Sequence, residues 1–188
     1  MTKNNAEYDF TLLLDNREVT EDLENALFEA GCDDATISLR YGCVCVTFSR
    51  EEEDLASAIL SAVRDVRKAG CSVRRVDACN LVTQAEIASR VQLSRQAINH
   101  YVTGKRGPGG FPPPACNIDD DERSTMWNWC EVASWFHQND MIREEQLNEA
   151  LVLDLINSWL EIQRQKCLNP EQAARIFETL GSRDCSCP

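Results

Sequence analysis

The feature that most constrains the fold of this chain is the segment 83–104, TQAEIASRVQLSRQAINHYVTG. Thr83 and Glu86 have the spacing of a capping box, which predicts the start of a short helix. Ser94 is suited to cap a second helix, and Leu93 falls in the turn before it. Apolar residues recur at helical spacing on both helices: Ile87, Ala88 and Val91, then Ala97, Ile98 and Tyr101. The segment therefore predicts two short helices packed against each other across a tight turn.

Between these apolar positions, the second helix carries polar side chains that can read base edges. Arginine pairs with guanine, asparagine and glutamine pair with adenine, and lysine and arginine hold phosphates. The candidate DNA-binding residues are Ser94, Arg95, Gln96, Asn99, His100, Thr103, Lys105 and Arg106. Arg95, Gln96 and Asn99 are expected to read bases, and Lys105 and Arg106 to contact phosphates. A purely structural helical hairpin explains the apolar positions but not this polar face, so DNA binding is the favoured interpretation.

The segment resembles the helix-turn-helix of bacterial and phage DNA-binding regulators. The residues that carry this resemblance are Gln84, Ala88, Leu93, Ser94, Ile98 and Tyr101. One residue departs from the pattern, because Gln92 occupies the turn position that usually holds glycine. Its backbone is therefore expected to be left-handed or nearly so, at some cost in free energy.

The residues that follow extend the resemblance to about residues 80–138. A stiff loop, GKRGPGGFPPP at 104–114, is followed by the motif WNW at 127–129 and by a short helix that contains Trp135. This order is similar to the AlpA- and MerR-like winged helix-turn-helix module, in which a small hairpin flanks the recognition helix. The resemblance implies sequence-specific binding of double-stranded DNA. Four aromatic residues are expected to form the core of this domain rather than to stack on bases: Phe111, Trp127, Trp129 and Trp135.

The first 78 residues alternate between strand and helix patterns. Residues 8–14 carry apolar side chains at every second position, and further strands are predicted at 35–39, 44–48 and 72–76. Apolar stripes predict one helix between Thr20 and Gly31 and a second one that ends at Gly70. The order β-α-β-β-α-β is typical of a ferredoxin-like sandwich, with two helices on one face of a four-stranded antiparallel sheet. That fold serves sensors, dimerisation modules and enzymes, so it does not settle the function.

Charge is distributed unevenly along the 188 residues, whose formal net charge is −12. Residues 1–63 hold 14 acidic and 4 basic side chains, whereas residues 64–115 hold 9 basic and 3 acidic ones. A chain this acidic is not expected to coat nucleic acid by bulk attraction. Its positive centre, however, contains the two-helix segment. Affinity for DNA is therefore expected to rest on base contacts and on the pairing of two half-sites.

The ten cysteines and two histidines do not form a recognisable metal site or catalytic set. No C-x-x-C pair occurs, and neither histidine has zinc-ligand spacing from a cysteine pair. Cys43 and Cys45 are interpreted as small apolar residues of a strand, and the acids at 33–34 and 51–54 as helix caps and solvated surface. The four acids at 119–122 are expected in a solvent-exposed loop. No metal, no cofactor and no enzymatic activity are predicted.

The C-terminal region predicts two further helices. In residues 141–165 the apolar positions cover more than one face of the predicted helix. A helix with this pattern is expected to be buried from several sides. One row is Leu147, Leu151, Leu155 and Trp159, widened by Val152, Ile156, Leu160 and Ile162. A last helix follows Asn169, with Pro170 in its first turn; its predicted inner face is Ala173, Ile176, Phe177 and Leu180. These helices either pack on the N-terminal domain or join two chains. Dimerisation is favoured, because one helix-turn-helix usually needs a second copy to read a palindrome.

Together these patterns predict an α+β protein with three parts. Residues 1–78 form a ferredoxin-like sandwich that senses a ligand or binds a protein partner through its acidic surface. Residues 79–138 form a winged helix-turn-helix DNA-binding domain, and residues 139–188 form a helical segment for dimerisation or packing. The predicted function is that of a homodimeric transcriptional regulator that binds a palindromic operator, as a repressor or an autoregulating antitoxin-like protein.

The alternative function is an acidic adaptor protein whose helical pair is a docking module for another protein. The sequence contains no apolar run long enough for a membrane helix and no apolar stretch typical of a signal peptide near its N-terminus, so a cytoplasmic location without membrane contact is predicted.

Overall fold

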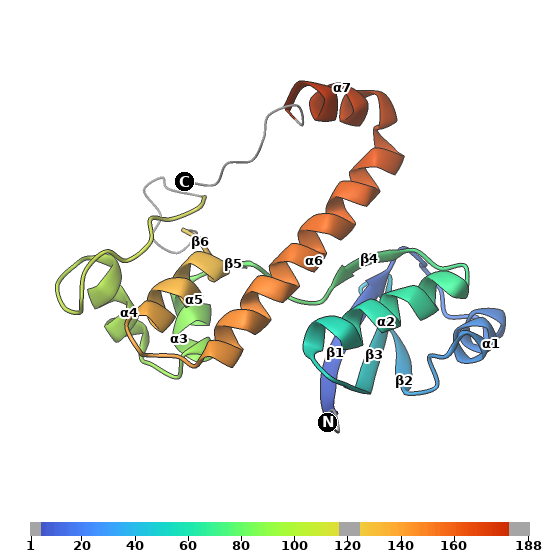
Figure 1. Cartoon of the computed structure of the whole chain (residues 1–188), viewed down its shortest axis with the longest axis horizontal. Coiled ribbons are helices and arrows are strands. Elements are labelled where there is room, and N and C mark those ends of the chain that lie inside the picture. Colours follow the sequence, from blue (N-terminus) through green and yellow to red (C-terminus); the bar gives the residue numbers. More distant parts are fainter. Residues whose placement is uncertain (1–4, 117–124, 181–188) are drawn as a thin grey trace. The chain divides into compact units, whose positions relative to one another are not determined.

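The computed structural model describes residues 5–116 and 125–180 of this mixed α+β protein (Figure 1). The contacts divide these residues into two compact units. The first unit contains residues 5–77 and 155–180, and the second contains residues 78–116 and 125–154. The division into domains 1–78, 79–138 and 139–188 stays a prediction. The acidic loop predicted at 119–122 lies outside the described residues.

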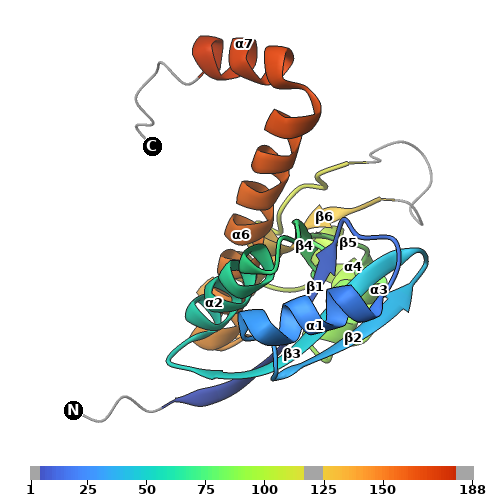
Figure 2. The same cartoon turned by 90° about the vertical axis from the view of Figure 1, so that its right-hand side faces the viewer.

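The first unit is built on a four-stranded antiparallel sheet with the order β2-β3-β1-β4. Its strands are β1 (Ala6–Leu14), β2 (Ala35–Arg40), β3 (Cys43–Glu52) and β4 (Val73–Val76). Two helices, α1 (Glu21–Ala30) and α2 (Leu55–Lys68), lie on the same side of this sheet (Figure 2). The predicted alternation of strands and helices is confirmed, although β3 continues four residues beyond its predicted end.

The local signals for these elements act as expected. The Thr20 hydroxyl accepts a hydrogen bond from the Leu23 amide, and Gly31 ends α1 in the left-handed conformation at φ +108°. β1 and β3 place Phe10 opposite Phe48 and Leu12 opposite Val46, and all four side chains are buried. Because paired residues of adjacent strands point to the same face, these side chains form the apolar face that the helices cover.

One charged side chain lies on this buried face. Arg50 is 8% exposed, and its guanidinium donates hydrogen bonds to both carboxylate oxygens of Asp34 at 2.7 and 2.9 Å. It also donates to Asp65 of α2 at 2.8 Å and to the carbonyl of Gly31 at 2.9 Å. The hydrogen bond to Asp34 is the largest cause that raises the pKa of Arg50, so this side chain stays charged. The interpretation of Asp34 as a merely solvated residue is therefore wrong.

The C-terminal helices are α6 (Glu144–Leu168) and α7 (Pro170–Leu180). Asn157 of α6 covers the outer edge of β4: its side chain accepts from the Val76 amide at 2.8 Å and donates to the Val76 carbonyl at 3.2 Å. Leu160 and Ala173 are buried. The helices are confirmed, and their burial against a second chain stays a prediction. Several apolar side chains of the two helices are exposed: Leu151, Leu155, Trp159, Ile162, Ile176, Phe177 and Leu180.

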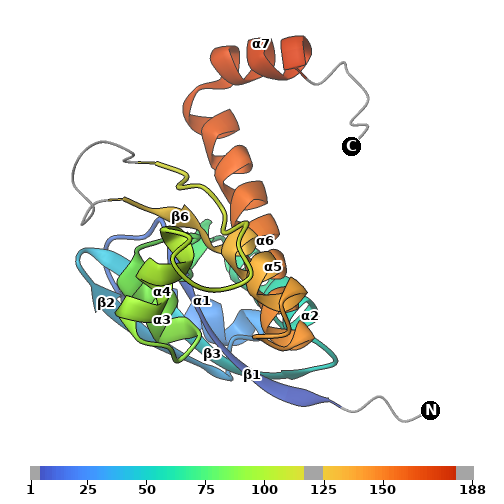
Figure 3. The same ribbon diagram turned by 90° about the vertical axis from the view of Figure 1, so that its left-hand side faces the viewer.

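The second unit contains two short strands and several helices (Figure 3). β5 (Leu81–Val82) pairs antiparallel with β6 (Trp127–Asn128), and an isolated bridge joins Cys116 to Met126. The helices are α3 (Gln84–Arg90), α4 (Arg95–Val102), α5 (Trp129–Gln138) and the first turns of α6. The strand pair closes the segment between α4 and α5 onto the segment that enters α3.

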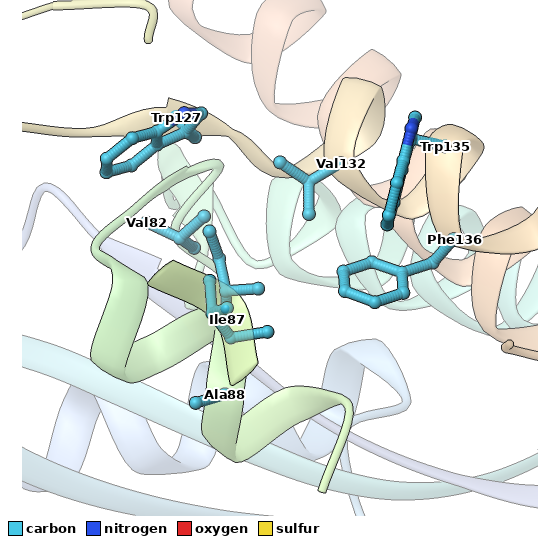
Figure 4. Close-up of a cluster of buried hydrophobic side chains, with 8 residues drawn as sticks. Val82, Ile87, Ala88, Trp127, Val132, Trp135 and Phe136 are labelled. Atoms are coloured by element: carbon cyan, nitrogen blue, oxygen red, sulfur yellow. The ribbon is translucent and has the colours of Figure 1, made fainter. Parts of the chain in front are cut away.

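A mainly aromatic and aliphatic core holds the second unit together (Figure 4). Its buried side chains are Val82, Ile87, Ala88, Ile98, Trp127, Val132, Trp135 and Phe136. Phe111 and Trp129 are partly buried and pack against this cluster. The prediction that the aromatic residues form the core of a small domain is therefore confirmed. Trp127 pairs with Val82 across the two strands, which brings residues far apart in sequence into one core.

Candidate nucleic-acid interface

The predicted DNA-binding residues of α4 share one face of the helix. At 3.6 residues per turn, Arg95, Gln96, Asn99, His100 and Thr103 fall on one side. The opposite side consists of buried Ile98 and of Tyr101 and Val102, which pack against the core. Arg95, Gln96 and Thr103 are exposed, and Asn99 and His100 are half-buried. The structure thus brings these residues together on one partly exposed surface of the second unit.

The turn before α4 fixes where this face begins. Gln92 has φ +55°, the left-handed conformation predicted for it. The Leu93 amide donates to the Ala88 carbonyl at 2.9 Å and the Gln92 amide to the Ser89 carbonyl at 3.3 Å, the hydrogen bonds of a Schellman motif. Ser94 then caps α4 by accepting from the Ala97 amide at 3.1 Å. Because both helix ends are satisfied, α4 starts at a defined residue and orientation.

A second left-handed residue ends α4 and positions the two predicted phosphate contacts. Gly104 has φ +66°, and the Lys105 amide donates to the His100 carbonyl at 3.0 Å. The Arg106 amide reaches the same carbonyl at 3.4 Å. The backbone of Lys105 and Arg106 is therefore folded back against the last turn of α4, while both side chains are exposed. The two cations lie directly beside the polar face.

The glycine-rich loop that follows is anchored to the aromatic core. The Trp135 indole N–H donates to the Gly109 carbonyl at 2.9 Å, and the Phe111 ring lies against Trp135 with centroids 5.0 Å apart. Gly107 has φ +99°, and a Cβ atom there would lie 2.5 Å from the Tyr101 ring. Glycine is required at this position both by its backbone and by the close approach of Tyr101. The loop is therefore packed in place.

The charges of this surface are available to a ligand. Within residues 5–116 and 125–180, no carboxylate forms an ion pair with Arg95, Lys105 or Arg106. Arg90 of α3 differs from them, since it donates to the Cys79 carbonyl at 2.9 Å and lies over the Trp129 ring at 4.8 Å. Arg90 therefore packs on its own unit, while the three cations at and after α4 point to solvent.

One contact that positions α5 had no signal in the sequence. Asn80 donates to Asp154 at 2.6 Å, and its carbonyl accepts from the Trp129 amide at 2.7 Å. Asn80 thus joins the segment before β5 to the start of α5 and to α6. A lone asparagine between Cys79 and Leu81 gives no indication of these partners, because they lie about 50 and 74 residues away in the sequence.

The thiols of Cys32 and Cys130 are buried and are not activated. Burial raises the pKa of Cys32 to about 11 and that of Cys130 to about 11, with nearby carboxylates adding to the shift. Both thiols are therefore protonated at neutral pH, and a thiol is a poor nucleophile and metal ligand. Among the described residues, no group of three or more His, Cys, Asp or Glu side chains is arranged to hold a metal ion.

Comparison with known proteins does not assign this chain to a family. No protein-family model matches the chain, and no curated protein and no solved structure is significantly similar to it. None of the helices in residues 5–116 and 125–180 combines the length and apolar character needed to cross a membrane.

Proposed function

We propose that this protein is a sequence-specific DNA-binding transcriptional regulator, a repressor or an autoregulating antitoxin-like protein. In this proposal α3 and α4 form a helix-turn-helix, and α4 is the recognition helix that enters the major groove. The β5–β6 pair and the anchored loop after α4 form a winged module around it. Arg95, Gln96 and Asn99 read base edges. Lys105 and Arg106 contact phosphates.

The observation that carries the proposal is the polar face of α4, exposed over a helix pair whose other side is buried. Preorganised base-reading side chains need a rigid support, because flexible ones lose rotamer entropy on binding. Both ends of α4 are capped, and its inner face contacts Trp135 and Phe136 through Tyr101 at centroid distances of 5.3 and 6.1 Å. This arrangement favours recognition of a fixed ligand shape such as the major groove.

The first unit is proposed to be a ferredoxin-like sandwich. The strand order β2-β3-β1-β4 and the element order strand-helix-strand-strand-helix-strand support this assignment. Its acidic surface is unsuited to phosphate contacts, so its role is to bind a ligand or a basic protein partner and thereby regulate DNA binding. A cytoplasmic location and the absence of enzymatic activity stay predictions of this proposal.

The test begins with sheared genomic DNA, from which the purified protein retains its preferred fragments for sequencing. The variant R95A/N99A is then compared with the wild type on the enriched duplex. Each base contact contributes about 1–3 kcal/mol, so we expect affinity to fall by about 100-fold or more while the fold is kept. The matched control is R67A/N25A, which removes one exposed arginine and one exposed asparagine from the helices of the first unit.

Salt dependence separates this function from the adaptor alternative. Phosphate contacts by Lys105 and Arg106 predict a steep loss of duplex affinity with salt, and removing both should reduce the slope of log K against log salt by about 2. Equal duplex binding by the wild type and R95A/N99A would contradict the proposal. Failure to enrich any genomic fragment would favour the adaptor, whose partner would be a basic protein.

A further inference from the structure

The longest helix of the chain carries an apolar stripe that the described chain does not cover. Leu151, Leu155, Trp159 and Ile162 of α6 are 45, 73, 55 and 38% exposed. At 3.6 residues per turn they fall within an arc of about 80°. The opposite side of α6 carries Asn157, bonded to β4, and Leu160, which is 2% exposed. One side of α6 is therefore packed, and the other presents large apolar side chains to solvent.

We infer that this stripe is the interface of a two-fold symmetric homodimer in which the α6 helices of two copies pair antiparallel, with Leu155 at the axis. This inference deepens the proposed function, since a palindromic operator needs two recognition helices, but the stripe exists whether or not the protein binds DNA. A two-fold axis at Leu155 brings Leu151 against Trp159 of the second copy, and Trp159 against Leu151 of the second copy.

The charges at the two ends of the stripe favour the antiparallel arrangement. Glu144 and Lys166 lie on the same arc as the apolar residues and are both exposed. Each is eleven residues from Leu155, so an antiparallel pair places Glu144 beside Lys166 of the second copy at both ends. A parallel pair would instead place Glu144 against Glu144 and Lys166 against Lys166. Opposite charges at flanking positions specify helix orientation in paired helices.

The exposed apolar surface also supplies a large part of the area that a stable dimer buries. A specific interface removes about 800 Å² from water on each partner. On α7 three more apolar side chains are exposed: Ile176, Phe177 and Leu180, at 50, 42 and 72%. A partly exposed large apolar side chain offers on the order of 100 Å², so the seven residues together approach the required area. On a monomer, an apolar surface of this size is an aggregation hazard.

The first experiment measures mass in the absence of DNA. Sedimentation equilibrium of the full chain is expected to give twice 21.2 kDa. In L155E two carboxylates meet at the axis, and we expect the dimer dissociation constant to rise about 100-fold. The matched control is L60E, which changes a leucine of α2 that is 53% exposed and lies outside the stripe. Circular dichroism checks that both variants keep their fold. A monomeric wild type, or an L155E variant as dimeric as L60E, would overturn the inference.

The second experiment tests the orientation. E144K alone brings two lysines together at each end of an antiparallel pair, so it should weaken the dimer about 5-fold at low salt, and K166E should act similarly. The double variant E144K/K166E restores the opposite charges and should recover most of the affinity. Failure of the double variant to recover would overturn the antiparallel arrangement. Because R95A/N99A should remain a dimer, a failure of the proposed DNA binding is distinguishable from a failure of this interface.

Discussion

Arg50 of the first unit is buried between two carboxylates, whereas Arg95 of the second unit is exposed and forms no ion pair within residues 5–116 and 125–180. The first unit uses charge inside its structure, to join β3 to α2 and to the turn after α1. The second unit excludes charge from its core, which is aromatic and aliphatic, and carries its cations on the surface of α4 and the following loop. The same residue type thus stabilises one unit and is available for binding in the other.

This contrast makes the proposed DNA binding compatible with the acidic composition of the chain. In the first unit the buried arginine is neutralised by Asp34 and Asp65, so it contributes no free positive charge. In the second unit Arg95 lies exposed at the start of α4, and Lys105 and Arg106 lie exposed just after its end. The net charge of the whole chain describes neither surface, because it sums the charges of the two units.

The largest expected effect comes from breaking the core of the second unit. Phe136 is fully buried, and its ring contacts Tyr101, Phe111 and Trp135. Phe136→Ala should lower the free energy of unfolding of this unit by about 3–5 kcal/mol. Thiol labelling followed by peptide mass spectrometry distinguishes the units, because Cys130 is buried in the second and Cys32 in the first. Cys130 should become labelled much faster than Cys32. Tyr41→Ala, which changes a fully exposed aromatic residue of the first unit, should leave both rates unchanged.

The next effect tests the buried charge of the first unit. Arg50→Met leaves Asp34 and Asp65 without their partner, and breaking a buried ion pair costs about 3–5 kcal/mol. We expect about 3 kcal/mol here, because both carboxylates are about a quarter exposed and keep some hydration. Labelling of Cys32 should accelerate while that of Cys130 does not. Arg40→Met, at an exposed arginine, is the control. Equal stability of Arg50→Met and the control would show that the buried pair does not stabilise this unit.

A smaller effect is expected from the loop after α4. Gly107→Ala places a Cβ atom against the Tyr101 ring and should destabilise the loop by about 1–3 kcal/mol. Because the loop carries Lys105 and Arg106, duplex affinity should fall as well. Gly110→Ala is the matched control, since Gly110 also has positive φ but would meet nothing within 4 Å. If both variants behave alike, backbone strain rather than contact with Tyr101 holds the loop.

The smallest expected effect is an increase in stability, whereas the preceding variants are expected to lose stability. Gln92 is exposed and left-handed, a conformation that costs a residue other than glycine about 1 kcal/mol. Gln92→Gly should therefore stabilise the second unit by about 1 kcal/mol, seen as a rise in its thermal midpoint by tryptophan fluorescence. Gln84→Gly, in the first turn of α3, should lower the midpoint instead. A fall in both variants would mean that the Gln92 side chain makes a stabilising contact.

Most elements of the fold could be predicted because their signals are local. Thr20, Thr83 and Ser94 cap the helices that were expected after them, and Gln92 adopts the predicted left-handed backbone. The face of α4 could also be predicted, because its spacing is determined within ten residues. These features depend on neighbours in sequence and are readable without tertiary structure.

The features that could not be predicted depend on partners far along the chain. Arg50 bonds to Asp65, which is 15 residues away in the sequence, and Asn80 bonds to Asp154, which is 74 residues away. Neither arginine nor asparagine indicates such a partner by its residue type. The same limit applies to α6, whose apolar circumference predicted burial from several sides. Apolar spacing shows that a surface favours removal from water, but it does not show whether the covering group belongs to the same chain.

Asn157 has a consequence for how this sheet can meet other chains. A sheet edge with unpaired backbone groups invites a further strand, and many proteins blunt such edges to avoid uncontrolled growth. At Val76 the side-chain amide of Asn157 takes the place of that strand, since it offers one donor and one acceptor. A peptide that extends the sheet along β4 must therefore first displace Asn157 from Val76, whereas β2 is the edge strand at the other end of the sheet.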